Sequence, residues 1–162
     1  MTTAPLTAGG LIARRDEWIA LCAQAFCGPP WHEPPRGALH TVERLLGMAA
    51  PGQPGFRCVA SFDPQGAVTG FAAGWLDTVL SGGAYQAFEL AELVVAPARQ
   101  GLGLGRALHD ALLAEAAGPQ LLMTLDVPEL RERYARWGWT AVELRRPERD
   151  PRDFVVMRRA EA

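Results

Sequence analysis

The most informative segment of the chain reads Leu93-Val94-Val95-Ala96-Pro97-Ala98-Arg99-Gln100-Gly101-Leu102-Gly103-Leu104-Gly105-Arg106. Its apolar start is typical of a buried strand, and its glycine-rich part leads directly into the spacing of an amphipathic helix. Glycines at alternate positions let backbone N–H groups approach a ligand closely, and a helix N-terminus adds partial positive charge. The segment therefore predicts a strand, a turn and a helix that together bind a phosphate group.

Two other phosphate-binding turns fit these residues less well. A Walker-type P-loop ends in Gly-Lys-Ser/Thr, whereas this turn ends in Gly105-Arg106-Ala107 and the chain contains no lysine. A dinucleotide fingerprint needs a glycine or alanine where this chain has Arg106 or Leu108. Asp126 follows at the distance of a ribose-binding acid, so a dinucleotide-binding protein stays the weaker alternative.

Composition narrows the class of protein. The chain has 162 residues, of which 49% are hydrophobic and 21% charged, which predicts one globular domain over residues 1–162. With a net charge of −2 and scattered arginines, no nucleic-acid partner is expected. No apolar run is long enough for a membrane span and no signal peptide is recognisable, so we expect a cytoplasmic protein without a membrane partner. The three cysteines, Cys22, Cys27 and Cys58, lack the spacing of a zinc site or a disulfide scaffold, so we expect buried thiols and no metal.

Hydrophobic periodicity predicts the remaining elements. Helices are expected at 11–26, 39–49, 104–117 and 128–137, and strands at 57–62, 68–76, 88–95, 121–127, 139–144 and 154–158. Pro51 and Gly52 should end the second helix, and a loop framed by prolines, residues 28–36, should join the first two helices. This order predicts a mixed α/β sheet with helices on its faces.

Two motifs resemble the GNAT acetyltransferase superfamily. The run from Gln100 to Gly105 resembles the family's Gln/Arg-x-x-Gly-x-Gly/Ala signature, after a strand that ends Val95-Ala96-Pro97. Tyr134-Ala135-Arg136-Trp137-Gly138-Trp139 resembles the family's Tyr-x-x-x-Gly-aromatic segment. The chain departs from the family at Val127, where an asparagine is often found. The resemblance implies an α/β (α+β), single-domain GNAT-like fold, in which the mixed central sheet is splayed between the fourth and fifth strands and carries helices on both faces.

The resemblance also implies an N-acetyltransferase with acetyl-CoA as cosubstrate. The pantetheine arm would pair with the backbone of Leu93 and Val95, and the pyrophosphate would rest on the glycine-rich turn. The cofactor-binding residues expected on this basis are Leu93, Val95, Gln100, Gly101, Leu102, Gly103, Leu104, Gly105 and Arg106.

The chemistry implied is direct attack of a primary amine on the thioester in a ternary complex. The N–H of Val95 would stabilise the oxyanion, and Tyr134, protonated at neutral pH, would donate a proton to the departing sulfur. Glu89 is the first choice for the general base and Glu92 the second. Because they are three residues apart on one strand, regular alternation would place them on opposite faces unless a bulge intervenes. Burial should raise the pKa of either carboxyl.

The acceptor is expected to be an amine on a small molecule or a peptide, and a homodimer is left open. Trp31 and His32, in the loop framed by prolines, are the predicted substrate-binding residues. His109 is expected on a solvated helix face. The main alternative function is a non-catalytic acyl-CoA-binding domain of the same fold, against which Tyr134 argues.

Overall fold

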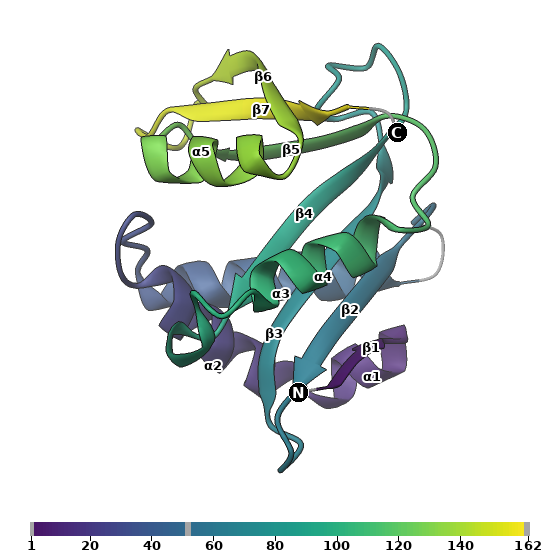
Figure 1. The fold of residues 1–162 in the computed structure, drawn as a ribbon, viewed down its shortest axis with the longest axis vertical. Helices are drawn as coiled ribbons and strands as arrows, with labels where there is room; N and C mark the ends of the chain where they lie inside the picture. The colour runs from purple at the N-terminus through teal and green to yellow at the C-terminus, as the bar shows by residue number, and fades with distance from the viewer. Residues whose placement is uncertain (1, 51–52, 161–162) are drawn as a thin grey trace.

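The structure is a computed structural model that describes residues 2–50 and 53–160 (Figure 1). The predicted helix stop at Pro51 and Gly52, and the ends of the predicted 1–162 domain, lie outside the described residues. The elements are β1 (Thr2–Pro5), α1 (Ala8–Ala13), α2 (Arg15–Phe26), α3 (Pro35–Ala49), β2 (Arg57–Phe62), β3 (Val68–Asp77), β4 (Ala87–Val95), a 3-10 turn (Pro97–Arg99), α4 (Leu104–Leu113), β5 (Gln120–Leu125), α5 (Pro128–Arg136), β6 (Trp139–Arg145) and β7 (Phe154–Arg159).

These strands form one seven-stranded sheet in the order β1-β2-β3-β4-β5-β7-β6. Neighbouring strands run antiparallel, except that β4 and β5 are parallel. In Figure 1, α4 and α5 cover one face of the sheet and α1 to α3 lie on the other. The predicted single-domain α/β fold with helices on both faces is therefore confirmed.

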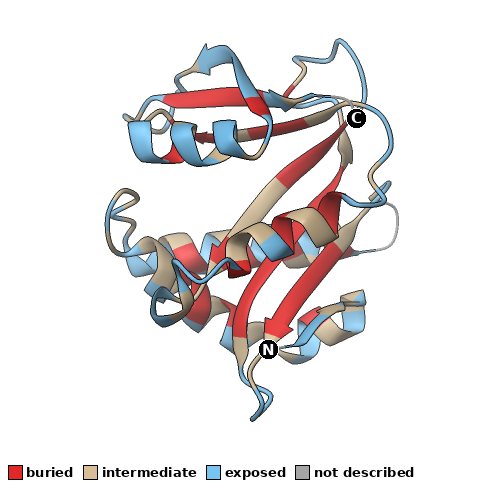
Figure 2. Cartoon of the chain, in the orientation of Figure 1, coloured by how far each residue is buried: buried red, intermediate tan, exposed pale blue. Residues whose placement is uncertain are grey.

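Each face carries its own apolar core, and Figure 2 shows the buried residues concentrated along the central strands. The stripe of α4, with Leu104, Leu108 and Leu112, packs on Phe88 and other apolar side chains of one face. On the opposite face, α1 to α3 bury a second cluster that includes Trp18 and Phe71, whose rings meet edge to face at 5.4 Å. Burial of these stripes is the main stabilising contribution to the fold.

The sheet is splayed where the resemblance implies. β4 pairs with β5 at Phe88 and Glu89, opposite Gln120 and Leu121. Beyond Glu89 the two described strands diverge, and α5 and the loop after α2 flank the opening (Figure 1). In the second half of β4, one backbone edge is therefore not hydrogen-bonded to any strand of the described residues.

A β-bulge in β4 changes which side chains share a face. The β3 partners step from Ala73, opposite Glu92, to Gly74, opposite Leu90, so one residue of β4 is extra. Gly74 is required beside this bulge, because a Cβ there would collide with the carbonyl oxygen of Glu89. The extra residue brings Glu89 and Glu92 to the same face of the sheet.

Four predictions of secondary structure need correction. Helix α3 begins at Pro35, inside the predicted loop 28–36, rather than at Leu39. The predicted helix 11–26 is two helices, because the chain leaves helical geometry at Arg14 (φ −114°, ψ 24°). There Leu11 O accepts both the backbone N–H of Arg14 at 3.2 Å and the indole N–H of Trp18 at 2.8 Å. Strand β1 was not predicted, since a polar strand at the edge of a sheet lacks an alternating apolar pattern. Helix α4 ends at Leu113 rather than at residue 117, and the residues after Leu113 form the turn that leads to β5.

No helix in the described part of the chain combines the length and the apolar character needed to cross a membrane.

Candidate active site

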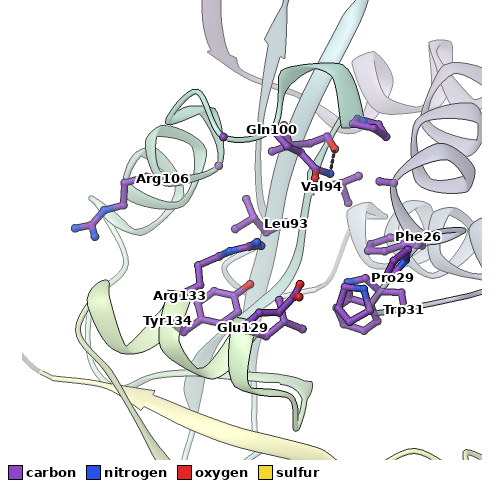
Figure 3. A pocket seen from close by; sticks show the side chains of 18 of the residues that line it. Phe26, Pro29, Trp31, Leu93, Val94, Gln100, Arg106, Glu129, Arg133 and Tyr134 are labelled. Carbon is purple, nitrogen blue, oxygen red and sulfur yellow. Dashed lines mark hydrogen bonds between the residues drawn. The ribbon is translucent and has the colours of Figure 1, made fainter.

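A pocket of about 830 Å³ opens between β4, α5 and the loop after α2 (Figure 3). This volume suits a ligand of cofactor size. Its walls come from the C-terminal half of β4, the glycine turn and start of α4, one side of α5, and the chain from Gln24 to Trp31. The pocket therefore lies in the opening between the splayed strands.

Alternate residues of the glycine-rich turn line this pocket. Gly101, Gly103 and Gly105 lie in its wall, whereas Leu102 is 68% exposed and Leu104 is buried in the α4 core. Gly101 and Gly103 adopt positive φ of 77° and 83°, and Gly103 is the N-cap of α4. The turn thus presents backbone rather than side chain at a helix N-terminus, which is the arrangement that favours a phosphate.

The backbone of β4 is orientated towards the opening at Leu93 and Val95. The N–H of Ala96 donates to the carbonyl oxygen of Thr69 in β3 at 2.9 Å. Successive N–H groups of a strand point alternately to its two edges. The N–H groups of Leu93 and Val95 therefore point away from β3, into the gap before β5. The carbonyl of Val95 accepts the side-chain amide of Gln100 at 3.0 Å, shown as the dashed line in Figure 3.

Tyr134 reaches the same pocket from α5 (Figure 3). Its ring stands edge to face against Trp137 at 5.6 Å and Trp139 at 6.3 Å. Burial raises the pKa of Tyr134 to about 12, so the phenol stays protonated through the physiological range. A protonated phenol in this position can donate a proton into the pocket.

His109 is buried, which corrects the prediction of a solvated position. Its Nδ1 lies 2.7 Å from Asp110 Oδ1, and its Nε2 accepts the indole N–H of Trp139 at 2.9 Å. Because Nε2 is an acceptor, the ring is neutral with its proton on Nδ1. His109 also contacts Trp137, a pocket residue, with ring centroids 4.9 Å apart. This network joins α4 to the aromatic rings that surround Tyr134.

The neutral state of His109 predicts a pH dependence of stability. Burial lowers the pKa of His109 below its ordinary value, although the Asp110 carboxylate opposes that shift. Below about pH 6.5, His109 binds a proton in the unfolded chain but not in the folded chain, so the free energy of unfolding falls as the pH falls. We expect this slope to be shallower in His109→Gln, by at most about 1.4 kcal/mol per pH unit. Urea unfolding between pH 6.5 and 5 measures both slopes, and parallel slopes would contradict a neutral His109.

The two predicted bases lie beside each other on the face covered by α3. Glu89 is 6% exposed, and the side chain of Glu92 is 13% exposed. Burial raises the pKa of Glu89 to about 7 and that of Glu92 to about 8, and Arg44 opposes both shifts. Both carboxyls therefore titrate near neutral pH, as a general base requires. Neither residue is among those that line the pocket described above.

The structure separates the two predicted acceptor residues. Trp31 lines the pocket, and its ring contacts Phe26 edge to face at 5.4 Å. Its backbone carbonyl accepts a hydrogen bond from Arg152 of the β6–β7 loop at 3.2 Å, so two distant loops meet there. His32 is exposed, has φ 47° and is not among the residues that line the pocket.

Several pocket residues were not predicted from the sequence. Those on α5 and just after it are Glu129, Leu130, Arg133, Arg136 and Trp137. Leu130 and Trp137 lie four residues before and three residues after Tyr134, so they share its face of the helix. That spacing was the available signal that this face lines the site.

Two smaller findings concern metals and thiols. Within residues 2–50 and 53–160, no three His, Cys, Asp or Glu side chains gather closely enough to hold a metal ion. Cys22 and Cys58 are buried as predicted, whereas the prediction for Cys27 is wrong, because this residue is exposed at the end of α2.

Comparison with known proteins identifies the class. Residues 17–139 match the family model described as Acetyltransferase (GNAT) family. The chain therefore belongs to the GNAT acetyltransferase family. A comparison with curated proteins finds no match.

Solved structures share the fold at low sequence identity. One, described as histone acetyltransferase HPA2 and related acetyltransferase from Corynebacterium glutamicum, is 18% identical with a TM-score of 0.71, covering 99% of this chain and 96% of that one. The ribosomal-protein-S18-alanine N-acetyltransferase from Escherichia coli is 16% identical with a TM-score of 0.65, covering 98% and 92%. Naa20 from Chaetomium thermophilum, in complex with a bisubstrate analogue, is 18% identical with a TM-score of 0.62, covering 98% and 86%.

Proposed function

We propose that this protein is an acetyl-CoA-dependent N-acetyltransferase that acts on a primary amine. The observation that carries the proposal is one continuous pocket, which begins at the glycine N-cap of α4, runs along the free edge of β4 and reaches Tyr134. Backbone N–H groups at a helix N-terminus can bind a phosphate. An unpaired strand edge can pair with the amides of an extended chain, and a protonated phenol can protonate a thiolate.

Each reacting group has a counterpart in the chain. Acetyl-CoA, as the acyl donor, supplies the thioester. The N–H of Val95 faces the opening and would stabilise the oxyanion, and Tyr134 would protonate the leaving sulfur. The amine would enter from the α3 face of the sheet, where Glu89 or Glu92 would accept its proton. Donor and acceptor would then meet in the gap between β4 and β5 as a ternary complex.

A non-catalytic acyl-CoA-binding domain would use the same turn and strand edge. Such a domain has no need of a phenol at the far end of the pocket or of two carboxyls that titrate near neutral pH. Those features favour the enzyme. A small-molecule or peptide acceptor, a homodimer and a cytoplasmic location also remain proposals.

The test combines binding with turnover. The thermal midpoint of unfolding should rise with acetyl-CoA and CoA, and should not rise with NAD. Release of free thiol from acetyl-CoA is then followed across a panel of amines, amino acids and peptides with free N-termini. Binding without thiol release from any amine would favour the non-catalytic alternative, and stabilisation by NAD alone would favour a dinucleotide-binding protein.

Trp31→Ala should raise the acceptor KM about tenfold and leave acetyl-CoA affinity unchanged. The indole is a rigid face in the pocket wall, and an apolar or cationic part of the acceptor would pack on it. Initial rates at varied acceptor concentration measure the effect. Tyr85→Ala is the matched control, because Tyr85 is an exposed aromatic in the loop before β4. If Tyr85→Ala raises the KM and Trp31→Ala does not, the acceptor lies against Tyr85 instead.

A further inference from the structure

One arginine links both candidate bases across the face of the sheet. Arg44, on α3, places Nη2 3.3 Å from Glu89 Oε1 and Nη1 3.8 Å from Glu92 Oε1. These two contacts exist because the β4 bulge turns both carboxyls to the same face. In the described part of the chain, the ion pairs of Glu89 and Glu92 are both with Arg44.

The guanidinium of Arg44 is held in place by more than charge. It lies over the ring of Trp75, 5.1 Å from the ring centroid. Trp75 is buried, stacks on Phe56 and donates its indole N–H to Asp77 at 2.9 Å. Arg44 therefore has a defined position on a rigid surface, although its side chain is 47% exposed.

The charges on this face are predominantly negative. The titratable and charged groups that face the pair come from α2, the loop after it, α3, β3, β4 and α5. They are Cys22, Glu33, Arg44, Asp77, Glu89, Glu92 and Tyr134. Arg152 lies beyond Glu33 and pairs with it and with Asp150. Of the carboxyls on this face, Glu89 has the least favourable surroundings for a negative charge, because its Oε2 is buried without a hydrogen-bond partner. An unpaired buried oxygen favours the protonated carboxyl, which cannot act as a base.

We propose that Arg44 is a positioning residue, which holds Glu89 and Glu92 together and keeps negative charge on the pair at neutral pH, so that one carboxylate can accept the proton of the amine. The inference rests on the proposed function for its kinetic consequence alone.

The decisive measurement is a carboxyl titration that requires no acetyl transfer. The protein is labelled with 13C at the glutamate carboxyls, and the signals of Glu89 and Glu92 are assigned with Glu89→Gln and Glu92→Gln. In Arg44→Gln the titration midpoint of at least one signal should rise by about one pH unit or more, since an adjacent opposite charge stabilises the ionised form by that amount. Arg44→Lys keeps the positive charge and should retain most of the wild-type midpoint.

Arg36→Gln is the matched control, because Arg36 is an exposed arginine on the same helix and the substitution removes the same charge. It should leave both midpoints in place. Arg44→Met, which keeps an aliphatic chain over Trp75, should shift the midpoints as Arg44→Gln does. Equal midpoints in Arg44→Met, Arg44→Gln and Arg36→Gln would overturn the proposal.

Kinetics supply the second readout. The acid limb of the kcat/KM profile for the amine should move to higher pH in Arg44→Gln, with activity recovered at alkaline pH and acetyl-CoA affinity unchanged. A uniform loss at every pH would indicate a structural effect and contradict a role in charge. If no amine is acetylated by the wild type, the proposed function fails, and the carboxyl titration still decides the role of Arg44.

Discussion

Gly103→Val should weaken acetyl-CoA binding by at least about 100-fold, which corresponds to about 2.8 kcal/mol. Gly103 is the N-cap of α4 and lies in the pocket wall at φ 83°. A Cβ at this position meets no atom of the protein within 4 Å, so a valine would project into the space that the phosphates need. The substitution therefore blocks the ligand without an internal clash.

Backbone strain must be separated from this blocking effect. A side chain at positive φ costs about 1–2 kcal/mol wherever it is placed. Gly118 is the matched control, since its φ is 79°, a Cβ there is equally unobstructed, and it lies after α4 outside the pocket lining. Gly118→Val should lose similar stability and keep acetyl-CoA affinity within about threefold. Calorimetric titration with acetyl-CoA measures both variants, and equal affinities for the two would place the phosphate site elsewhere.

Tyr134→Phe should lower kcat by about 10- to 1000-fold and leave acetyl-CoA affinity unchanged. The phenol is the proton donor in the proposed reaction, and the substitution removes its hydroxyl while keeping the ring. The edge contacts with Trp137 and Trp139 should survive, so the fold and the pocket should be intact.

The pH profile sharpens this prediction. Because burial raises the pKa of Tyr134 to about 12, the hydroxyl stays protonated far above neutral pH, and any basic limb of the wild-type profile below that value arises from another group. Tyr85→Phe is the matched control, as Tyr85 is the chain's only other tyrosine and is exposed. Steady-state rates with saturating acetyl-CoA test both variants. An unchanged kcat in Tyr134→Phe would leave Tyr134 with a structural role.

The predictions that held depend on local constraints. Glycines at alternate positions between an apolar strand and an amphipathic helix permit the tight turn that joins them, so the turn at Gly101 and Gly103 was predicted from this segment alone. The stripe of Leu104, Leu108 and Leu112 was sufficient to orientate α4 against the sheet.

The predictions that failed depend on contacts between distant parts of the chain. His109 lies beside the apolar stripe of α4, and helical spacing alone placed it on a solvated face. Trp139, which is 30 residues further along, supplies the donor that makes a buried neutral imidazole stable. No local pattern contains that partner, because it depends on how β6 packs against α4.

The sequence by itself therefore determined the order of elements from α3 onwards, the glycine-rich turn into α4 and the candidate tyrosine, since each follows from backbone preferences and spacing within one segment. Tertiary structure decided which groups act together. Pairing with β3 orientated the N–H of Val95 into the opening, and the bulge opposite Gly74 turned Glu89 and Glu92 to one face. Packing of α3 on that face then brought Arg44 to both carboxyls. These relations arise from strand register and helix packing, which depend on the whole chain at once.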